Sequence, residues 1–263
     1  MTDDEARSLC GFGEDRLLIR LVKKNRMPTP DFLNTGQGNR KQPMNPPPTL
    51  CLMLKAPRPG TVKTRLSARI GDAAATQIYR CLVERQAAQV PLDWRVEVHF
   101  TPGDSDAEMR AWLAPLLPEH TEFHPQPEGD LGARLSAALS GAAMRGASEV
   151  LFAGGDCPQL STERLRDAAE ALRAVSFALI PATDGGYVLI GLSGPHAFVF
   201  DGIAWSTPEV FAQTLRNIHA RGMSLRSFAP LEDVDDLPSL QRARKYCSWL
   251  PCVEDHPGFH VSS

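Results

Sequence analysis

The chain has 263 residues, is 43% hydrophobic and carries a formal net charge of −3, so it has enough apolar material to bury a core without a metal or disulfide. The near-neutral charge argues against a broad basic surface, and we expect no nucleic-acid partner. No stretch reaches the roughly 20 apolar residues that a membrane helix needs. The first residues are acidic where a secretory signal is basic, and the six cysteines are scattered without a C-x-x-C pair. These features predict a cytoplasmic protein with no membrane span.

The N-terminal part, residues 1–48, differs from the rest of the chain. One short helix is expected within Leu17–Lys24, and prolines and glycines around it, ending in Pro46-Pro47-Pro48, indicate irregular chain. We therefore expect an irregular extension over 1–48, one folded domain over 49–250 and a C-terminal tail over 251–263. Met44, just before the first strong strand, is a candidate for the true start.

From Thr49 onward, apolar runs alternate with helical patterns. Strands are predicted at Leu50–Leu54, Trp94–Phe100, Val150–Ala153, Phe177–Ile180 and Tyr187–Ile190, and helices at Asp72–Val90, Leu131–Met144 and Thr162–Ala174, with further helices opened by capping boxes at Ser105 and Ser206. Strands that alternate with helices of ten or more residues predict an α/β fold, with a mostly parallel central sheet and helices on both faces. Ligands of such sheets bind beyond the carboxyl ends of the strands.

The loop after the first strand, Lys55–Leu66, carries a cluster of cations shaped by proline and glycine. Lysine and arginine neutralise phosphates, and arginine does so with two parallel hydrogen bonds. The loop is neither a Walker A loop nor a dinucleotide fingerprint, and a solvated basic loop remains an alternative. Its position after a buried strand favours an anion site formed by Lys55, Arg58, Lys63, Thr64 and Arg65.

Two acidic turns follow later strands of the predicted sheet. Asp156 stands in Gly154-Gly155-Asp156-Cys157-Pro158, directly after Ala153, where a carboxylate suits Mg²⁺ or Mn²⁺. Asp184 opens Asp184-Gly185-Gly186-Tyr187, which hairpin chemistry alone would also explain. Two carboxylates at one sheet edge would make a metal and substrate site; capping the following turn is the plainer role for Asp156.

Two further segments are candidates. The segment Glu128–Arg134 could bring Gly132 and Arg134 near a ligand, or it could simply lead into a helix. The acidic cluster Glu232–Asp236 precedes a helix, where acids ordinarily complement the helix dipole, and Asp235 is a candidate second metal ligand. No H-E-x-x-H, G-x-S-x-G or zinc spacing is present, which excludes the common zinc and serine hydrolases.

Several of these motifs occur together and in order: Lys55–Leu66, Gly129–Gly132, Gly155–Pro158, Asp184–Tyr187, Trp205–Thr207 and Asp233–Asp235. The ordered set, over about Leu50–Tyr246, resembles a bacterial family of GT-A-like transferases that includes glycosyltransferases associated with arsenosugar biosynthesis. It is also similar to the phospholactate and molybdenum-cofactor guanylyltransferases.

The resemblance implies a Rossmann-like GT-A fold, as in nucleotide-diphospho-sugar transferases. It implies that Lys63-Thr64-Arg65-Leu66 contacts phosphates and that Asp156 binds the metal. It places Asp184, Gly185, Gly186, Tyr187 and Trp205 in the acceptor or sugar region. Gly155-Asp156-Cys157-Pro158 departs from the family pattern because it lacks the second acid of the D-x-D motif.

These observations lead to three hypotheses. The first is a metal-dependent glycosyltransferase with Mg²⁺ or Mn²⁺, a nucleotide-sugar donor and a small-molecule acceptor, in which Asp184 and Lys63 are the catalytic residues. The second is a nucleotidyltransferase that condenses an NTP with a phosphorylated small molecule. The third is a nucleotide-sugar-binding protein without catalysis.

Overall fold

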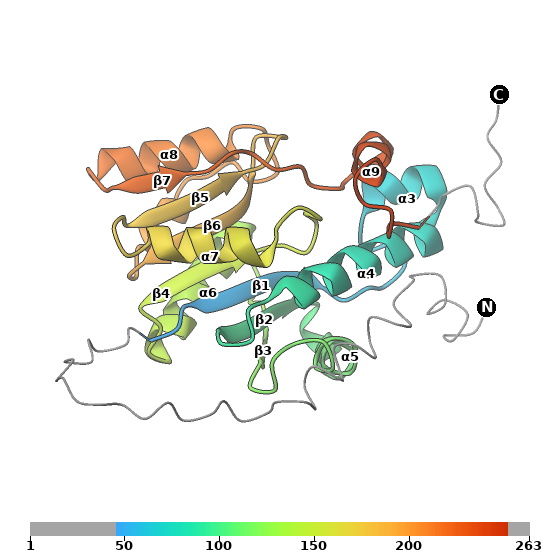
Figure 1. Cartoon of the computed structure of the whole chain (residues 1–263), viewed down its shortest axis with the longest axis horizontal. Coiled ribbons are helices and arrows are strands. Elements are labelled where there is room, and N and C mark those ends of the chain that lie inside the picture. Colours follow the sequence, from blue (N-terminus) through green and yellow to red (C-terminus); the bar gives the residue numbers. More distant parts are fainter. Residues whose placement is uncertain (1–45, 252–263) are drawn as a thin grey trace, which may run out of the picture. The chain divides into compact units, whose positions relative to one another are not determined.

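The computed structural model describes residues 46–251 (Figure 1). The predicted N-terminal extension, the helix within Leu17–Lys24, the Met44 start and nearly all of the C-terminal tail therefore lie outside the described residues. Within them, the chain runs through β1 (Thr49–Lys55), α3 (Thr64–Ile70), α4 (Asp72–Gln89), β2 (Arg95–Thr101), η1 (Gly103–Ser105), α5 (Asp106–Leu113), β3 (Glu122–Pro125), α6 (Leu131–Met144), β4 (Glu149–Ala153), α7 (Thr162–Ala171), β5 (Phe177–Pro181), β6 (Tyr187–Ser193), η2 (Ala197–Phe200), α8 (Val210–Ala220), β7 (Leu225–Ser227) and α9 (Leu237–Arg244).

The described strands form a seven-stranded sheet in the order β3-β2-β1-β4-β6-β5-β7. β1 pairs in parallel with β2 and β4, β2 with β3, and β5 with β7. β6 runs antiparallel between β4 and β5, so β4 and β5 point the same way. The mostly parallel sheet predicted from the alternation is confirmed, and the carboxyl ends of β1, β4 and β5 meet at one edge.

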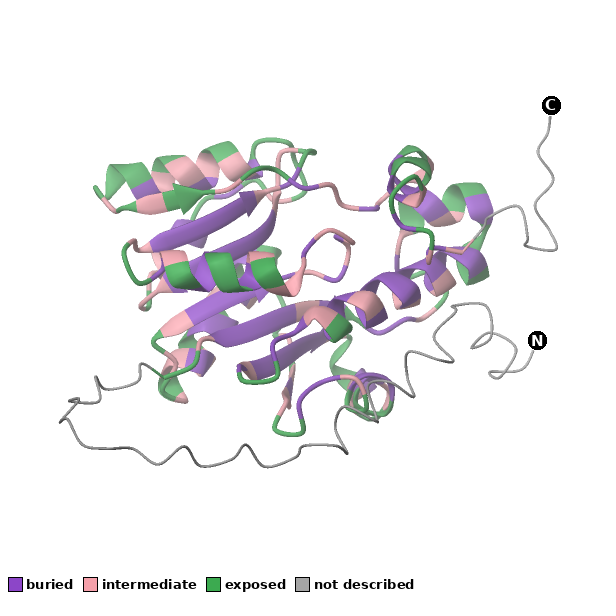
Figure 2. Ribbon diagram, viewed as in Figure 1, coloured by how far each residue is buried: buried purple, intermediate pink, exposed green. Residues whose placement is uncertain are grey.

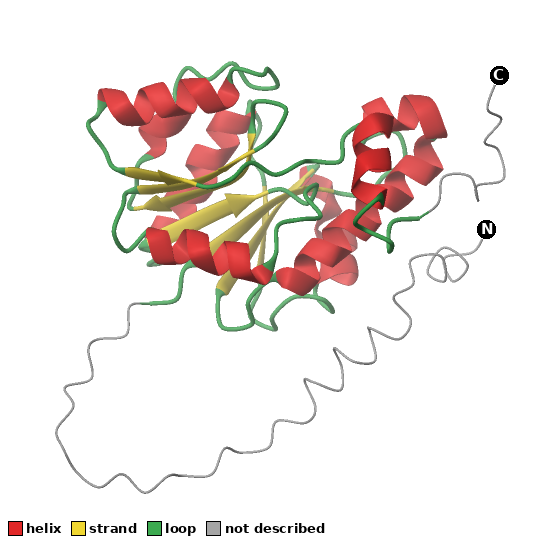
Figure 3. Cartoon of the chain, turned by 45° about the horizontal axis from the view of Figure 1, so that its top comes forward, coloured by secondary structure: helices red, strands yellow, loops and turns green. Residues whose placement is uncertain are grey.

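Helices cover both faces of the sheet, and the strands between them are buried (Figures 2 and 3). Alternate residues of a strand point to opposite faces. Leu50, Leu52 and Leu54 of β1 accordingly join the core beneath α4, α5 and α7, whereas Cys51 joins the core beneath α6 and α8. A third cluster ties α3 to α4 and α9 through Leu66, Ile78 and Leu240, among others. This third cluster matters for function because it anchors the helix that follows the basic loop.

Several local expectations were wrong. Neither capping box forms: the Ser105 hydroxyl donates to the carbonyl of Pro102 at 2.6 Å, and α8 begins at Val210 after Glu209, with no side-chain cap. α7 ends at Ala171 rather than Ala174. The helix α3 and the strands β3 and β7 were not expected, since three to seven residues are too few for a periodic pattern to emerge.

The cysteines divide into two kinds. Cys51, Cys157 and Cys247 are free and buried, as expected of thiols that pack as small hydrophobes. Cys81 is fully buried in α4 and is disulfide-bonded.

Candidate functional site

The candidate site lies where three strands of the sheet end. The basic loop follows β1, the Asp156 turn follows β4 and the Asp184 turn follows β5. After β7 the chain runs across this edge, because Leu231 N donates to Pro181 O at 2.9 Å and Val234 N donates to Asp156 O at 3.0 Å. These backbone bonds bring the acidic segment Glu232–Asp236 over the strand ends.

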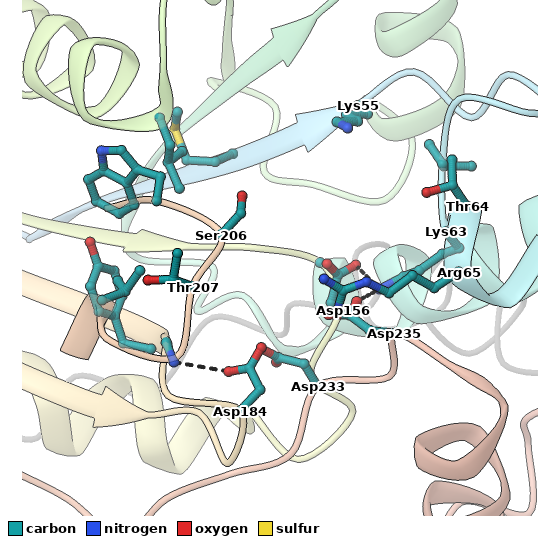
Figure 4. A pocket seen from close by; sticks show the side chains of 18 of the residues that line it. Lys55, Lys63, Thr64, Arg65, Asp156, Asp184, Ser206, Thr207, Asp233 and Asp235 are labelled. Carbon is teal, nitrogen blue, oxygen red and sulfur yellow. Dashed lines mark hydrogen bonds and ion pairs between the residues drawn. The ribbon is translucent and has the colours of Figure 1, made fainter. Parts of the chain in front are cut away.

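Lys63 lies at the centre of the acidic groups (Figure 4). It precedes α3 in a left-handed conformation, with φ 48°, and its Nζ is 2.9 Å from Asp156 Oδ1 and 2.8 Å from Asp235 Oδ1. Its side chain is only 4% exposed. Burial lowers its pKa, but the two carboxylates outweigh burial and the net shift is upward. Lys63 is therefore a charged lysine held between two acids.

The position of Asp156 depends on the glycine before it. A Cβ on Gly155 would lie 2.4 Å from Val83 Cγ2 and 3.0 Å from Leu54 Cδ2, so only glycine lets the turn approach α4 this closely. Tyr79, on the same helix, accepts a hydrogen bond from Lys55 N and donates to Lys55 O, at 2.9 and 3.0 Å. α4 thus fixes both the end of β1 and the Asp156 turn.

Asp233 is the acid that is least compensated in this group. Its half-buried carboxyl lies near Asp156, Asp235 and Asp184, and Lys63 is the nearby cation. Burial, followed by repulsion from Asp156 and Asp235, raises its pKa to about 7. Figure 4 shows it beside Asp184, whose Oδ1 accepts a hydrogen bond from Gly186 N at 3.0 Å. A carboxyl group that faces a cavity and whose pKa is raised by burial and like charges is a candidate for a functional role.

The Asp184 turn is locked to the loop before α8. Gly185 has φ 95°, and a Cβ on it would lie 2.2 Å from Pro208 O, so the turn requires glycine for both conformation and contact. Phe211 N donates to Gly185 O at 2.9 Å. On the other side of this loop, a Cβ on Gly132 would lie 2.8 Å from Trp205 Nε1, so Gly132 makes room for the indole.

Two aromatic residues, Tyr187 and Trp205, form part of the wall of the site. The rings of Tyr187 and Trp205 meet edge to face, with centroids 6.4 Å apart. Burial raises the pKa of the Tyr187 hydroxyl, which excludes it as a base at neutral pH. Flat aromatic surfaces of this kind suit the apolar faces of sugars and bases.

Together these elements enclose a cavity of about 740 Å³. This volume falls within the range of small-molecule sites. It is lined by Met53, Lys55, Val62, Lys63, Thr64, Arg65, Tyr79, Leu131, Gly155, Asp156, Asp184, Gly186, Tyr187, Trp205, Ser206, Thr207, Pro208, Val210, Asp233 and Asp235. The cavity is therefore lined by cationic side chains from the loop after β1, by acidic side chains at the strand ends and by the aromatic pair.

Most of the predicted site residues line this cavity, but four do not: Arg58, Gly132, Arg134 and Gly185. Arg58 pairs with η1 and α5, with its Nε 3.0 Å from Glu108 and its Nη1 3.2 Å from Asp104. Its phosphate contact stays a prediction. Gly132 and Gly185 act indirectly, by admitting Trp205 and Pro208, and Arg134 is half-buried in α6.

Asp233, Tyr79 and Met53 are the notable lining residues that were not singled out. The acidic run around Asp235 was a usable signal for Asp233. Nothing in the sequence pattern of α4 or β1 marks Tyr79 or Met53 as facing a cavity rather than the core.

The donor set around Lys63 fits a divalent cation of the magnesium type. Asp156 Oδ1 and Asp235 Oδ1 converge on one nitrogen, so both oxygens can reach a single ion in its place. Asp156 Oδ1 is buried and, among the described residues, is paired with Lys63 Nζ at 2.9 Å, so a metal that binds this oxygen would replace the ammonium as its partner. Mg²⁺ and Mn²⁺ are commonly held by one or two carboxylates together with substrate phosphates.

A second group of potential ligands lies on β2 and β3. Glu97, with a side chain 3% exposed, receives hydrogen bonds from Arg145 Nε and Nη2 at 2.9 and 2.6 Å and lies 2.9 Å from His99 Nε2. Although it is buried, the histidine and the guanidinium lower the pKa of Glu97 to about 2. A carboxylate already bound by a guanidinium through two hydrogen bonds is a poor metal ligand, so we interpret this group as a structural ion network.

None of the helices in the described part of the chain has the length and apolar character to cross a membrane.

Comparison with known proteins gives one family match and several structural matches. Residues 84–207 match a family described as an uncharacterised protein conserved in bacteria (DUF2064). A candidate nucleotide-diphospho-sugar transferase from Desulfovibrio desulfuricans G20 has 30% sequence identity and a TM-score of 0.70, over 82% of this chain and 91% of that one. No curated protein matches significantly.

A more distant structure shares the fold alone. The 4-diphosphocytidyl-2C-methyl-D-erythritol synthase from Anaerococcus prevotii DSM 20548 is 8% identical, with a TM-score of 0.52 over 76% of this chain and 96% of that one. The predicted fold, that of the nucleotide-diphospho-sugar transferases, is thereby confirmed.

Proposed function

Because the chain belongs to the same bacterial family, of GT-A-like fold, as the Desulfovibrio candidate nucleotide-diphospho-sugar transferase, we propose that it is a metal-dependent glycosyltransferase. Its donor is a nucleotide sugar and its acceptor a small molecule. The observation that carries this proposal is the cavity itself, in which cations, paired carboxylates and an aromatic wall meet at the carboxyl ends of β1, β4 and β5.

The cationic side of the cavity suits the diphosphate of the donor. Lys55, Lys63, Thr64 and Arg65 all line it and offer two ammonium groups, a hydroxyl and a guanidinium. Arginine can bind a phosphate through two hydrogen bonds, whereas lysine acts as a compact point charge. The developing negative charge of a departing nucleoside diphosphate would be stabilised by these fixed donors.

Asp156 and Asp235 are the residues that would hold Mg²⁺ or Mn²⁺. Such an ion, when bound, neutralises the phosphate charge and lowers the cost of releasing the nucleoside diphosphate. This donor set replaces the D-x-D pair common in glycosyltransferases by two acids from distant parts of the chain.

Asp184 is suited to the acceptor. One of its oxygens is fixed by Gly186 N, and Asp184 lines the cavity beside Asp233 (Figure 4). A carboxylate oriented in this way can accept a hydrogen bond from an acceptor hydroxyl and take its proton. Tyr187 and Trp205 would pack against the sugar or the acceptor.

Nucleotidyl transfer is the second candidate. The fold does not separate the two reactions, since a diphosphocytidyl-compound synthase shares it, and the same cations would serve a triphosphate. The products separate them: glycosyl transfer releases a nucleoside diphosphate, whereas nucleotidyl transfer releases pyrophosphate. A nucleotide-sugar-binding protein without catalysis would release neither.

The deciding experiment is a product assay. Purified protein, Mn²⁺ and a bacterial small-molecule extract as acceptor pool are mixed in turn with each common nucleotide sugar and each NTP, and free nucleoside diphosphate and pyrophosphate are measured. We expect nucleoside diphosphate from one nucleotide sugar, and no release with EDTA or with Asp156→Asn. Pyrophosphate from an NTP would transfer the assignment to nucleotidyl transfer.

A cytoplasmic location remains a prediction.

A further inference from the structure

Lys63 is bound differently from the other cations of the cavity. Lys55 and Arg65 line the same cavity, but Lys63 is the cation whose ammonium pairs with both Asp156 and Asp235. Its side chain is 4% exposed, whereas the two carboxylates are 38% and 41% exposed. The lysine is thus enclosed behind acids that themselves face the cavity.

The oxygens that hold Lys63 are those a metal would need. Both contacts use the Oδ1 atoms of the two acids, so an ion that takes these oxygens in place of the ammonium must displace it or approach it closely. A divalent cation beside a buried ammonium is repelled at short range, where solvent screens poorly. The lysine also offsets one unit of the negative charge that would attract the ion.

The backbone of Lys63 is fixed by α3, whereas its ammonium group is held by the two ion pairs with Asp156 and Asp235. Lys63 O accepts the first hydrogen bond of α3, from Ser67 N at 2.7 Å, and α3 is anchored through the buried Leu66. The long lysine stem can swing from this fixed point, and the neighbouring cations Lys55 and Arg65 mark where phosphate would lie.

We propose that Lys63 is a built-in competitor of the metal: in the ligand-free protein it occupies the two carboxylates, and it leaves them for the substrate phosphates when the metal binds. This inference rests on the proposed function. Because a displaced ammonium needs a new anionic partner, the metal and the substrate phosphates bind cooperatively. Each raises the affinity of the protein for the other by the same factor. The ligand-free protein is accordingly a weak metal binder.

The test is a titration of the ligand-free protein with Mn²⁺. Binding is measured by calorimetry and by the electron paramagnetic resonance signal of free Mn²⁺. Lys63→Gln removes the charge but keeps a polar side chain, which is one atom shorter than that of lysine. We expect it to bind Mn²⁺ at least tenfold more tightly than the natural protein, which corresponds to about 1.4 kcal/mol. Lys63→Met should show the same gain, and it serves as the second variant should Lys63→Gln fail to fold.

Two controls separate charge at Lys63 from charge in the cavity at large. Lys55→Met removes a cation from the same cavity and should change Mn²⁺ affinity by less than threefold. Asp156→Asn combined with Lys63→Gln should remove the gain, because one of the two ligands is lost. An equal gain in Lys55→Met would overturn the proposal in favour of a general field effect.

Equal or weaker Mn²⁺ binding by both Lys63 variants would also overturn the proposal, since it would mean that the lysine organises the carboxylates rather than competing for them. That result leaves the proposed function intact if the product assay still shows nucleoside diphosphate release that EDTA abolishes. Absence of Mn²⁺ binding in every variant, together with donor turnover in EDTA, would overturn both the competition and the metal site.

Discussion

Asp233→Asn should stabilise the protein at neutral pH. The carboxyl of Asp233 has its pKa raised from 3.8 to about 7 by burial and by Asp156 and Asp235. A raised pKa means that the folded protein favours the protonated acid, so stability is fully present below pH 3.8 and is lost as pH rises toward 7. At 1.36 kcal/mol per pH unit, the loss approaches about 4 kcal/mol as an upper value.

Asparagine resembles the neutral acid and does not titrate, so it avoids this loss. The stability gap between Asp233→Asn and the natural protein should be near zero at pH 4, widen through pH 6 and level off above pH 7. For a chain of about 200 described residues, each kcal/mol shifts the melting temperature by about 2–4 °C, so a gain of several degrees is expected at pH 8. Thermal unfolding in EDTA at pH 4, 6 and 8 measures it.

The matched control is Asp236→Asn, three residues further along. Asp236 caps α9 by accepting from Ser239 N at 2.8 Å, and its pKa is lowered by the Ser239 hydroxyl and backbone. Its substitution should therefore give no gain that grows with pH. If the difference in stability between Asp233→Asn and the natural protein is absent, or is the same at all pH values, the view that the ionised Asp233 carboxylate destabilises the folded protein is refuted.

Three further predictions concern Asp156, Gly155 and Glu97. Asp156→Asn should abolish turnover of the donor found by the product assay, yet retain the far-ultraviolet circular dichroism of the natural protein. Gly155→Ala should cost about 1–3 kcal/mol in urea unfolding by overpacking against Val83, and combining it with Val83→Ala should cost less than the sum; strict additivity would contradict this contact. Glu97→Gln should lose about 3 kcal/mol above pH 4.5, because the pKa of Glu97 is lowered to about 2; the loss should shrink as pH falls from 4.5 to 2, and a pH-independent loss would refute the ion pairing.

The fold was predictable because its central strands are buried on both faces. Leu50–Leu54, Val150–Ala153 and Phe177–Ile180 are continuous apolar runs, and such runs mark parallel strands between two helical layers. Once these strands were placed, the loops after them became the candidate site, and Asp156, Asp184 and Lys63 do line one cavity.

What the sequence did not reveal depends on contacts between distant segments. The burial of Asp233 follows from Leu231–Asp235 crossing the strand ends through backbone bonds, which leave no mark on local composition. Arg58 lies in the basic loop and yet binds Asp104 and Glu108, about fifty residues away. A pattern of residue types and spacings identifies which loops come together. It does not show which charged side chains in those loops are already paired within the protein.

The central claim, a nucleotide-sugar site that depends on metal, is tested most directly by thermal stability. The protein is melted with each nucleotide sugar and each NTP, with and without Mn²⁺, beside Asp156→Asn. A ligand at a hundred times its dissociation constant adds about 2.7 kcal/mol, which is a shift of several degrees. We predict such a shift for one nucleotide sugar with Mn²⁺, and its loss both without the metal and in Asp156→Asn. A shift that survives EDTA and Asp156→Asn, or no shift with any nucleotide, would contradict the account.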